Sequence, residues 1–71
     1  MQEPIRVYKK TKSKLRIEVY RDFSMASDGW FLDIQYIENK SNKIAHRHCV
    51  IEKDLEGWER GFVIDGWLLI N

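Results

Sequence analysis

The stretch that most constrains the fold of this chain is residues 61–70, which read GFVIDGWLLI. Asp65 and Gly66 stand between two apolar runs, and an Asp-Gly pair is favoured in tight turns whose central residues need a positive φ. The pattern therefore predicts a β-hairpin with strands at residues 62–64 and 67–70. Both strands are apolar at nearly every position, so both of their faces need cover from the rest of the domain or from a partner.

The preceding part of the chain predicts an antiparallel meander. Residues 15–20 alternate between apolar and polar side chains, which is typical of a half-buried strand. Residues 30–38 and 44–52 read as two further strands, and a short edge strand follows Pro4. Turn-forming residues at 21–29 and a polar stretch at 39–43 connect these strands. The side chains expected on the core face are Leu15, Ile17, Val19, Trp30, Leu32, Ile34 and Tyr36.

The segment between the meander and the predicted hairpin is ambiguous. Apolar residues recur there at helical spacing, so a helix running through to Asp65 is the rival of the hairpin. Gly57 and Gly61 oppose that helix, because each costs about 1 kcal/mol relative to alanine inside a helix. We therefore expect one short helical turn near residues 54–59, followed by the hairpin. The apolar residues at helical spacing are Leu55, Trp58 and Phe62.

The expected fold class is all-β, with a single domain over residues 1–71. Five to six short strands form a small antiparallel meander that curls into a barrel or half-open roll, because so short a chain cannot build a two-layer sandwich with a proper core. If the longer helix forms instead, the alternative is an α+β fold. In that alternative one helix lies across a three- to four-stranded antiparallel sheet.

Composition narrows the classes of partner and compartment. Twelve basic and eleven acidic residues nearly cancel, so no net field directs the chain to nucleic acid or to an anionic membrane. Cys49 is the single cysteine, which excludes a disulfide within the chain. With no signal-peptide pattern and no long apolar segment, we expect a cytoplasmic protein.

The stretch His46-Arg47-His48-Cys49 is the first candidate for chemistry. On a strand the two imidazoles share one face and Cys49 points to the other, so the spacing supplies two metal ligands where a zinc site usually has three or four from protein. Cys49 likewise has no imidazole on its own face to activate a thiolate. No Gly-rich phosphate loop or paired acid and base is recognisable. We expect no metal, no cofactor and no small-molecule substrate, and we predict that the protein is not an enzyme.

Two surfaces are candidates for binding a macromolecule. Aromatic and apolar residues near the C-terminus suit an interface with another protein or with a second copy, because large buried side chains dominate binding energy. The alternative is nucleic-acid binding through the basic segment 9–16, where lysines can contact phosphates. The candidates for partner binding are Trp58, Trp67, Leu68 and Ile70. The candidates for nucleic-acid binding are Lys9, Lys10, Lys12, Lys14 and Arg16.

Overall fold

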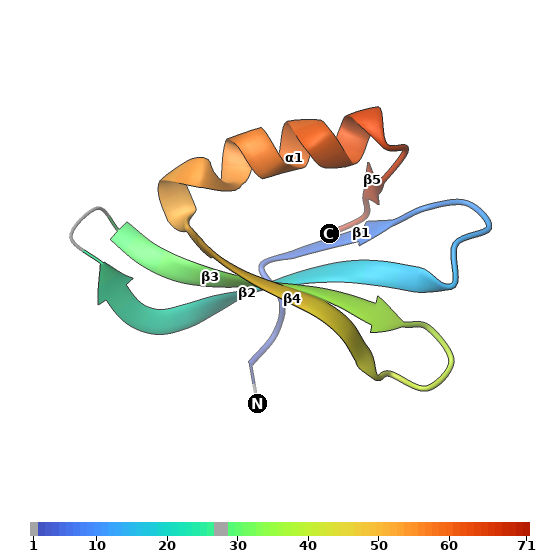
Figure 1. Cartoon of the computed structure of the whole chain (residues 1–71), viewed down its shortest axis with the longest axis horizontal. Helices are drawn as coiled ribbons and strands as arrows, with labels where there is room; N and C mark the ends of the chain where they lie inside the picture. Colours follow the sequence, from blue (N-terminus) through green and yellow to red (C-terminus); the bar gives the residue numbers. More distant parts are fainter. Residues whose placement is uncertain (1, 27–28) are drawn as a thin grey trace.

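The computed structural model describes residues 2–26 and 29–71 and shows one antiparallel sheet with a helix across one of its faces (Figure 1). The sheet has five strands in the order β4-β3-β2-β1-β5, so β4 and β5 form its two edges. A 3-10 turn, η1 (Glu52–Asp54), runs directly into the helix α1 (Leu55–Ile64). The strands are β1 (Arg6–Lys9), β2 (Leu15–Ala26), β3 (Gly29–Glu38), β4 (Ile44–Ile51) and β5 (Leu68–Leu69).

The predicted meander is confirmed for β2, β3 and β4. Val19 lies opposite Ile34 and Ile17 lies opposite Tyr36, so the apolar side chains of the two central strands share the face that the helix covers. β2 continues to Ala26, and the turn region expected at residues 21–29 is therefore strand over its first part. Its residues 27 and 28 lie outside the described residues.

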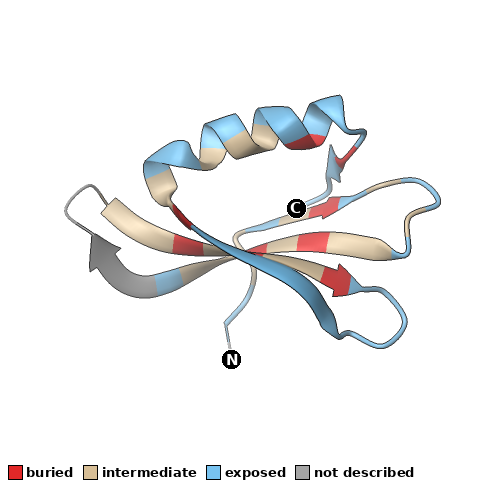
Figure 2. Ribbon diagram, in the orientation of Figure 1, coloured by how far each residue is buried: buried red, intermediate tan, exposed pale blue. Residues whose placement is uncertain are grey.

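The core lies between this face of the sheet and α1 (Figure 2). The two central strands supply its most deeply buried aliphatic side chains, and Tyr8 joins them from β1. The helix contributes Phe62, with Leu55 and Trp58 packed beside it. These three helical residues recur at the spacing that puts them on one side of a helix. The aliphatic side chains at the centre are Ile17, Val19, Leu32 and Ile34.

The hairpin predicted at residues 61–70 is wrong. Residues 61–64 form the last turn of α1, and Asp65-Gly66 ends that helix. The N–H of Gly66 donates to the carbonyl of Val63 at 3.0 Å, and the N–H of Trp67 donates to the carbonyl of Phe62 at 2.8 Å. With Gly66 at φ 93°, these are the bonds of a Schellman helix cap. Asp65, at φ −82°, lacks the positive φ that the predicted hairpin turn requires.

The predicted barrel is also not formed, because the described strands leave β4 and β5 as separate edges. The helical segment of residues 52–64 covers the apolar face that barrel closure would have covered. The fold is thus the α+β alternative with a larger sheet than expected. The N-terminal strand is not an edge strand either, since β1 lies between β2 and β5.

Two glycines of this region are expected to respond to alanine in opposite directions. A Cβ on Gly61 meets no atom within 4 Å, so Gly61→Ala is expected to stabilise the fold by about 0.5 to 1 kcal/mol through helix propensity. Gly66→Ala puts a side chain at φ 93° and is expected to destabilise it by about 1 to 2 kcal/mol. Urea denaturation of both variants measures the two shifts. Equal midpoints would contradict the helix cap.

Candidate functional site

The most exposed apolar residues of the described chain lie at the end of α1 and in the segment that follows it. They are more than half exposed, with exposed fractions from 54 to 87%. Figure 2 shows this part of the molecule, beside the edge strand β5, mostly in the colour of exposed residues. We call this set the C-terminal apolar surface. It consists of Val63, Ile64, Leu68, Leu69 and Ile70.

The C-terminal apolar surface extends over both faces of the sheet edge. Leu69 pairs with Tyr8, whose side chain is in the core, so Leu69 lies on the helix side. Val63, Ile64 and Leu69 line one shallow hollow of about 480 Å³ with Tyr8. Leu68 pairs with Lys9 and lies on the opposite face. A flat partner on one face would therefore leave part of this surface exposed.

Polar residues border the hollow but do not interrupt it. Glu56 and Arg60 lie along its rim, together with Glu59. The hydroxyl of Tyr8 donates a hydrogen bond to the Glu59 carboxylate, which also lies 3.8 Å from the Nε of Arg6. Burial, helped by the hydrogen bond to Glu59, raises the pKa of Tyr8 above its usual value. At neutral pH the hydroxyl of Tyr8 is therefore protonated. The side chain of Tyr8 forms the base of the hollow.

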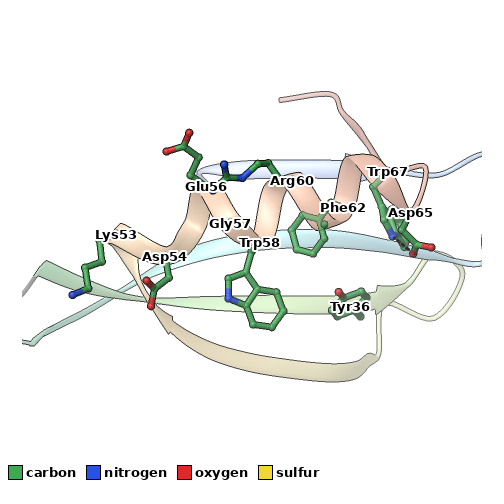
Figure 3. Close-up of a pocket in the computed structure, with 11 residues that line it drawn as sticks. Tyr36, Lys53, Asp54, Glu56, Gly57, Trp58, Arg60, Phe62, Asp65 and Trp67 are labelled. Carbon is green, nitrogen blue, oxygen red and sulfur yellow. Dashed lines mark hydrogen bonds between the residues drawn. The ribbon is translucent and has the colours of Figure 1, made fainter.

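A second hollow, the aromatic cleft, runs along the other side of α1 and has a volume of about 660 Å³. Figure 3 shows Trp58 and Phe62 extending from the helix toward Tyr36 of β3. The ring of Tyr36 lies 6.4 Å from Phe62 and 6.2 Å from Trp67. Burial, and then the charge of Asp65, raise the pKa of Tyr36. The cleft is thus lined by a packed group of rings, with ionisable side chains of both signs around it.

The four residues predicted to bind a partner are divided between these two regions. Leu68 and Ile70 belong to the C-terminal apolar surface, whereas Trp58 lines the aromatic cleft. Trp67 is only 6% exposed. Its Nε1 donates to Asp65 at 3.2 Å, and Lys10 lies 5.7 Å from its ring centroid. Trp67 therefore belongs to the core, and its contribution to binding stays a prediction.

Three members of the C-terminal apolar surface were missing from the sequence-based set. Val63 and Ile64 stand in the first of the two apolar runs and Leu69 in the second, so the two runs were the available signal. The predicted hairpin obscured it, because a strand assigned to residues 62–64 alternates its side chains between two faces. On the helix, Phe62 points to the core while Val63 and Ile64 face solvent.

Two cations of the basic segment 9–16 are paired with carboxylates of this chain. Lys10 lies 3.5 Å from Asp65, and the Nε of Arg16 lies 2.6 Å from Glu18. Both cations thus have a carboxylate partner that competes with a phosphate. Lys9 and Arg16 lie opposite each other in the β1–β2 pair, and residues 10–14 connect these two strands. The remaining candidates, Lys9, Lys12 and Lys14, are exposed, and nucleic-acid binding through them stays a prediction.

The face of the sheet opposite the helix carries two polar networks. Arg16 and the hydroxyl of Tyr20 both donate to the carboxylate of Glu18. Burial alone would raise the pKa of Glu18, but these hydrogen bonds outweigh burial and hold the pKa below its usual value. Burial and the bond to Glu18 raise the pKa of Tyr20 to about 12. These hydrogen bonds join three side chains of β2 on the face of the sheet that the helix does not cover.

The second polar network joins β3 to β4. The Nη2 of Arg47 lies 2.6 Å from the carboxylate of Asp33, which also accepts a hydrogen bond from Gln35 at 2.8 Å. Burial would raise the pKa of Asp33, but the two hydrogen bonds outweigh it and lower the pKa. These groups are satisfied by one another, which is the usual arrangement on a solvated sheet face. This arrangement indicates that the three side chains stabilise the pairing of β3 with β4.

His46 and His48 lie on the helix side of β4, opposite Tyr36 and Ile34. The ring centroid of His48 is 5.2 Å from that of Trp58. Cys49 is a free, exposed thiol opposite Asp33 on the other face. Over the described residues, no group of three or more potential ligands could hold a metal ion. No helix in the described part of the chain is long and apolar enough to cross a membrane.

Comparisons of the chain with protein-family models, with curated proteins and with solved structures found no match. Among the exposed surfaces of the described residues, the C-terminal apolar surface is the one whose exposure is hardest to reconcile with an isolated domain.

Proposed function

We propose that this protein is a non-enzymatic binding protein whose C-terminal apolar surface docks against another protein chain. The observation that supports the proposal is the exposure of its five aliphatic side chains at one end of the molecule, divided between the two faces of the sheet edge. Together they expose roughly 600 Å², and exposed apolar side chains gathered at one place mark protein interaction sites. Water contact over such an area is unfavourable, and burial against a partner relieves it.

The surroundings of the C-terminal apolar surface fit the same function. Protein interfaces have an apolar centre and a polar rim, and here Glu56, Glu59 and Arg60 border the hollow lined by Val63, Ile64 and Leu69. Nucleic-acid binding has weaker support, because Lys10 and Arg16 already contact carboxylates of this chain. The apolar surface is therefore the better guide to function.

Site-specific photocrosslinking in the native cell tests this proposal. A photoreactive amino acid, p-benzoylphenylalanine, is placed at position 64 and, as a matched control, at position 44. Both positions hold an exposed isoleucine, but Ile44 lies in β4 at the opposite edge of the sheet. We expect protein adducts from position 64 and few or none from position 44.

Competition with protein that carries no photoreactive group distinguishes specific docking from nonspecific adhesion. Excess wild-type protein is expected to suppress the adducts from position 64, while excess Leu69→Lys protein leaves them, because a lysine cannot be buried there without a partner for its charge. Equal adduct yields from positions 64 and 44, or no adducts from position 64, would show that the C-terminal apolar surface is not a binding surface.

A further inference from the structure

We infer that the C-terminal apolar surface binds a second copy of this chain, through antiparallel pairing of two β5 edges around a twofold axis at Leu69. The inference rests on the proposed function and specifies its partner. It would join the two sheets into one continuous sheet with both helices on the same face. Three features of β5 favour this pairing: its outward main-chain groups, apolar side chains on both of its faces, and the absence of charged side chains.

The first step concerns the main chain of Leu69. The N–H of Ile70 donates to the carbonyl of Val7 at 2.9 Å and so points toward β1. Main-chain N–H and C=O groups of successive strand residues point to alternate sides, so those of Leu69 face away from β1. β5 is an edge of the described sheet, and its outer groups are therefore available to another strand. Two copies of Leu69 placed opposite each other would satisfy both pairs of groups.

The second step concerns the side chains. Leu69, with Val63 and Ile64, lies on the helix side of the edge, whereas Leu68 lies on the other face. Only a chain added along the edge covers both faces at once. A twofold axis at Leu69 brings the two helix ends together over the Leu69 pair. On the other face it places Leu68 opposite Ile70 of the second copy. Each residue of the C-terminal apolar surface thereby gains an apolar neighbour.

The third step is charge, which favours self-pairing at β5 over self-pairing at β4. Residues 66–71 carry no ionisable side chain, so pairing of two β5 strands places no like-charged side chains opposite each other within the strand pair. β4 contains Arg47 and directly follows Lys43. Antiparallel pairing of two β4 strands would bring cations of the two copies together, which is destabilising. β4 thus carries the charges that commonly protect an edge, and β5 does not.

The exposed area sets an upper limit on the size of the interface. Complete burial of the C-terminal apolar surface on both copies removes at most about 1,200 Å² from water, at the lower end of the range for specific interfaces. The same patch serves on both sides, as a closed twofold dimer requires. A dimer of this size is expected to be reversible and to depend on protein concentration.

Sedimentation equilibrium over a hundredfold range of concentration tests the dimer. The mass is expected to rise from 8.6 kDa to twice that value. Leu69→Lys and Ile64→Lys are expected to abolish the rise, and Ile44→Lys, at the opposite edge, is expected to leave it unchanged. A circular dichroism spectrum of each variant confirms that it is folded. A wild-type monomer at every concentration would overturn the inference.

Disulfide trapping tests the register in a Cys49→Ser background. Directly opposed residues in an antiparallel pair have Cα atoms about 4.5 to 5.5 Å apart, which suits a disulfide. Leu69→Cys is therefore expected to form a covalent dimer under mild oxidation at least about tenfold faster than Leu68→Cys, whose opposite residue is Ile70. Equal rates at positions 68 and 69 would overturn pairing around Leu69.

The two proposals fail in different ways. Photoadducts from position 64 that contain a different protein, together with a monomer in sedimentation, would overturn the dimer and leave the proposed function intact. An absence of photoadducts from position 64 together with a strict monomer would overturn both.

Discussion

Truncation of Ile34 to alanine is expected to leave little folded protein, whereas the same truncation at Ile64 is expected to be almost neutral. Ile34 is 0% exposed and lies in β3 opposite Val19 and His48. Removing a buried isoleucine side chain beyond Cβ costs about 2 to 5 kcal/mol, and a chain this small is stable by only about 3 to 5 kcal/mol. Ile64 is 87% exposed, so its truncation should change stability by less than about 0.5 kcal/mol.

The comparison is made by urea denaturation at a protein concentration low enough to exclude association. The two variants remove the same atoms from the same residue type, so the difference between them measures burial together with a smaller difference in strand and helix propensity, each below about 1 kcal/mol. Similar denaturation midpoints for Ile34→Ala and Ile64→Ala would contradict the position of the core between α1 and the sheet.

Truncation of Trp67 to alanine is expected to be the second severe change. Trp67 is 6% exposed, and its ring packs 6.2 Å from that of Tyr36. The loss of a buried tryptophan side chain costs about 3 to 5 kcal/mol. Because Trp67 also donates the N–H that closes the helix cap to Phe62, a disturbed main chain there would affect both the end of α1 and the docking of β5.

Leu68→Ala is the matched control for Trp67→Ala, since Leu68 is the next residue but is mostly exposed. Thermal unfolding followed by circular dichroism is expected to show a large fall in the midpoint for Trp67→Ala and little change for Leu68→Ala in dilute monomer. If Trp67→Ala kept its stability and lost only partner binding, Trp67 would be an interface residue, as the sequence suggested.

The meander was predictable from sequence because its pattern is local. Strict alternation at Ile17 and Val19, and again at Leu32 and Ile34, admits one buried face, and the structure places these side chains in the core. The polar, turn-forming residues at 39–43 connect two strands of the meander, as predicted. The register was not predicted, because alternation determines which side chains share the buried face but not which residues of neighbouring strands lie opposite each other.

The C-terminal region was not predictable in the same way, because its local signals fit two structures. An Asp-Gly pair supplies a positive φ to a tight hairpin and equally to the cap at the end of a helix. The cost of Gly57 and Gly61 inside a helix, about 1 kcal/mol each, favoured the hairpin. Burial of Trp58 and Phe62 against the sheet is worth more than that penalty. Tertiary packing therefore outweighs the glycine penalty and favours the helix over the hairpin.

The same ambiguity limits what the sequence says about the C-terminal apolar surface. The apolar run ending at Ile70 indicated a segment that is apolar on both faces, and the structure leaves Leu68, Leu69 and Ile70 exposed. Its members are not equivalent, however, because the helix cap turns Trp67 inward and leaves Leu68 and Ile70 outside. These residues are neighbours in the sequence. The position at which the helix ends determines which of them are buried and which are exposed.

The position of β1 between β2 and β5 has a consequence for the order of folding. The pairs β1–β2, β2–β3 and β3–β4 each join neighbours along the chain, whereas Tyr8 pairs with Leu69 across about 60 residues. Closing a loop of that length costs about 2 kcal/mol more than closing a five-residue connection. The meander is therefore expected to form early, with the docking of the C-terminal segment as the late event that completes the native state. In native-state hydrogen exchange of the monomer, the amides of this segment should open first, well before those of β2 and β3.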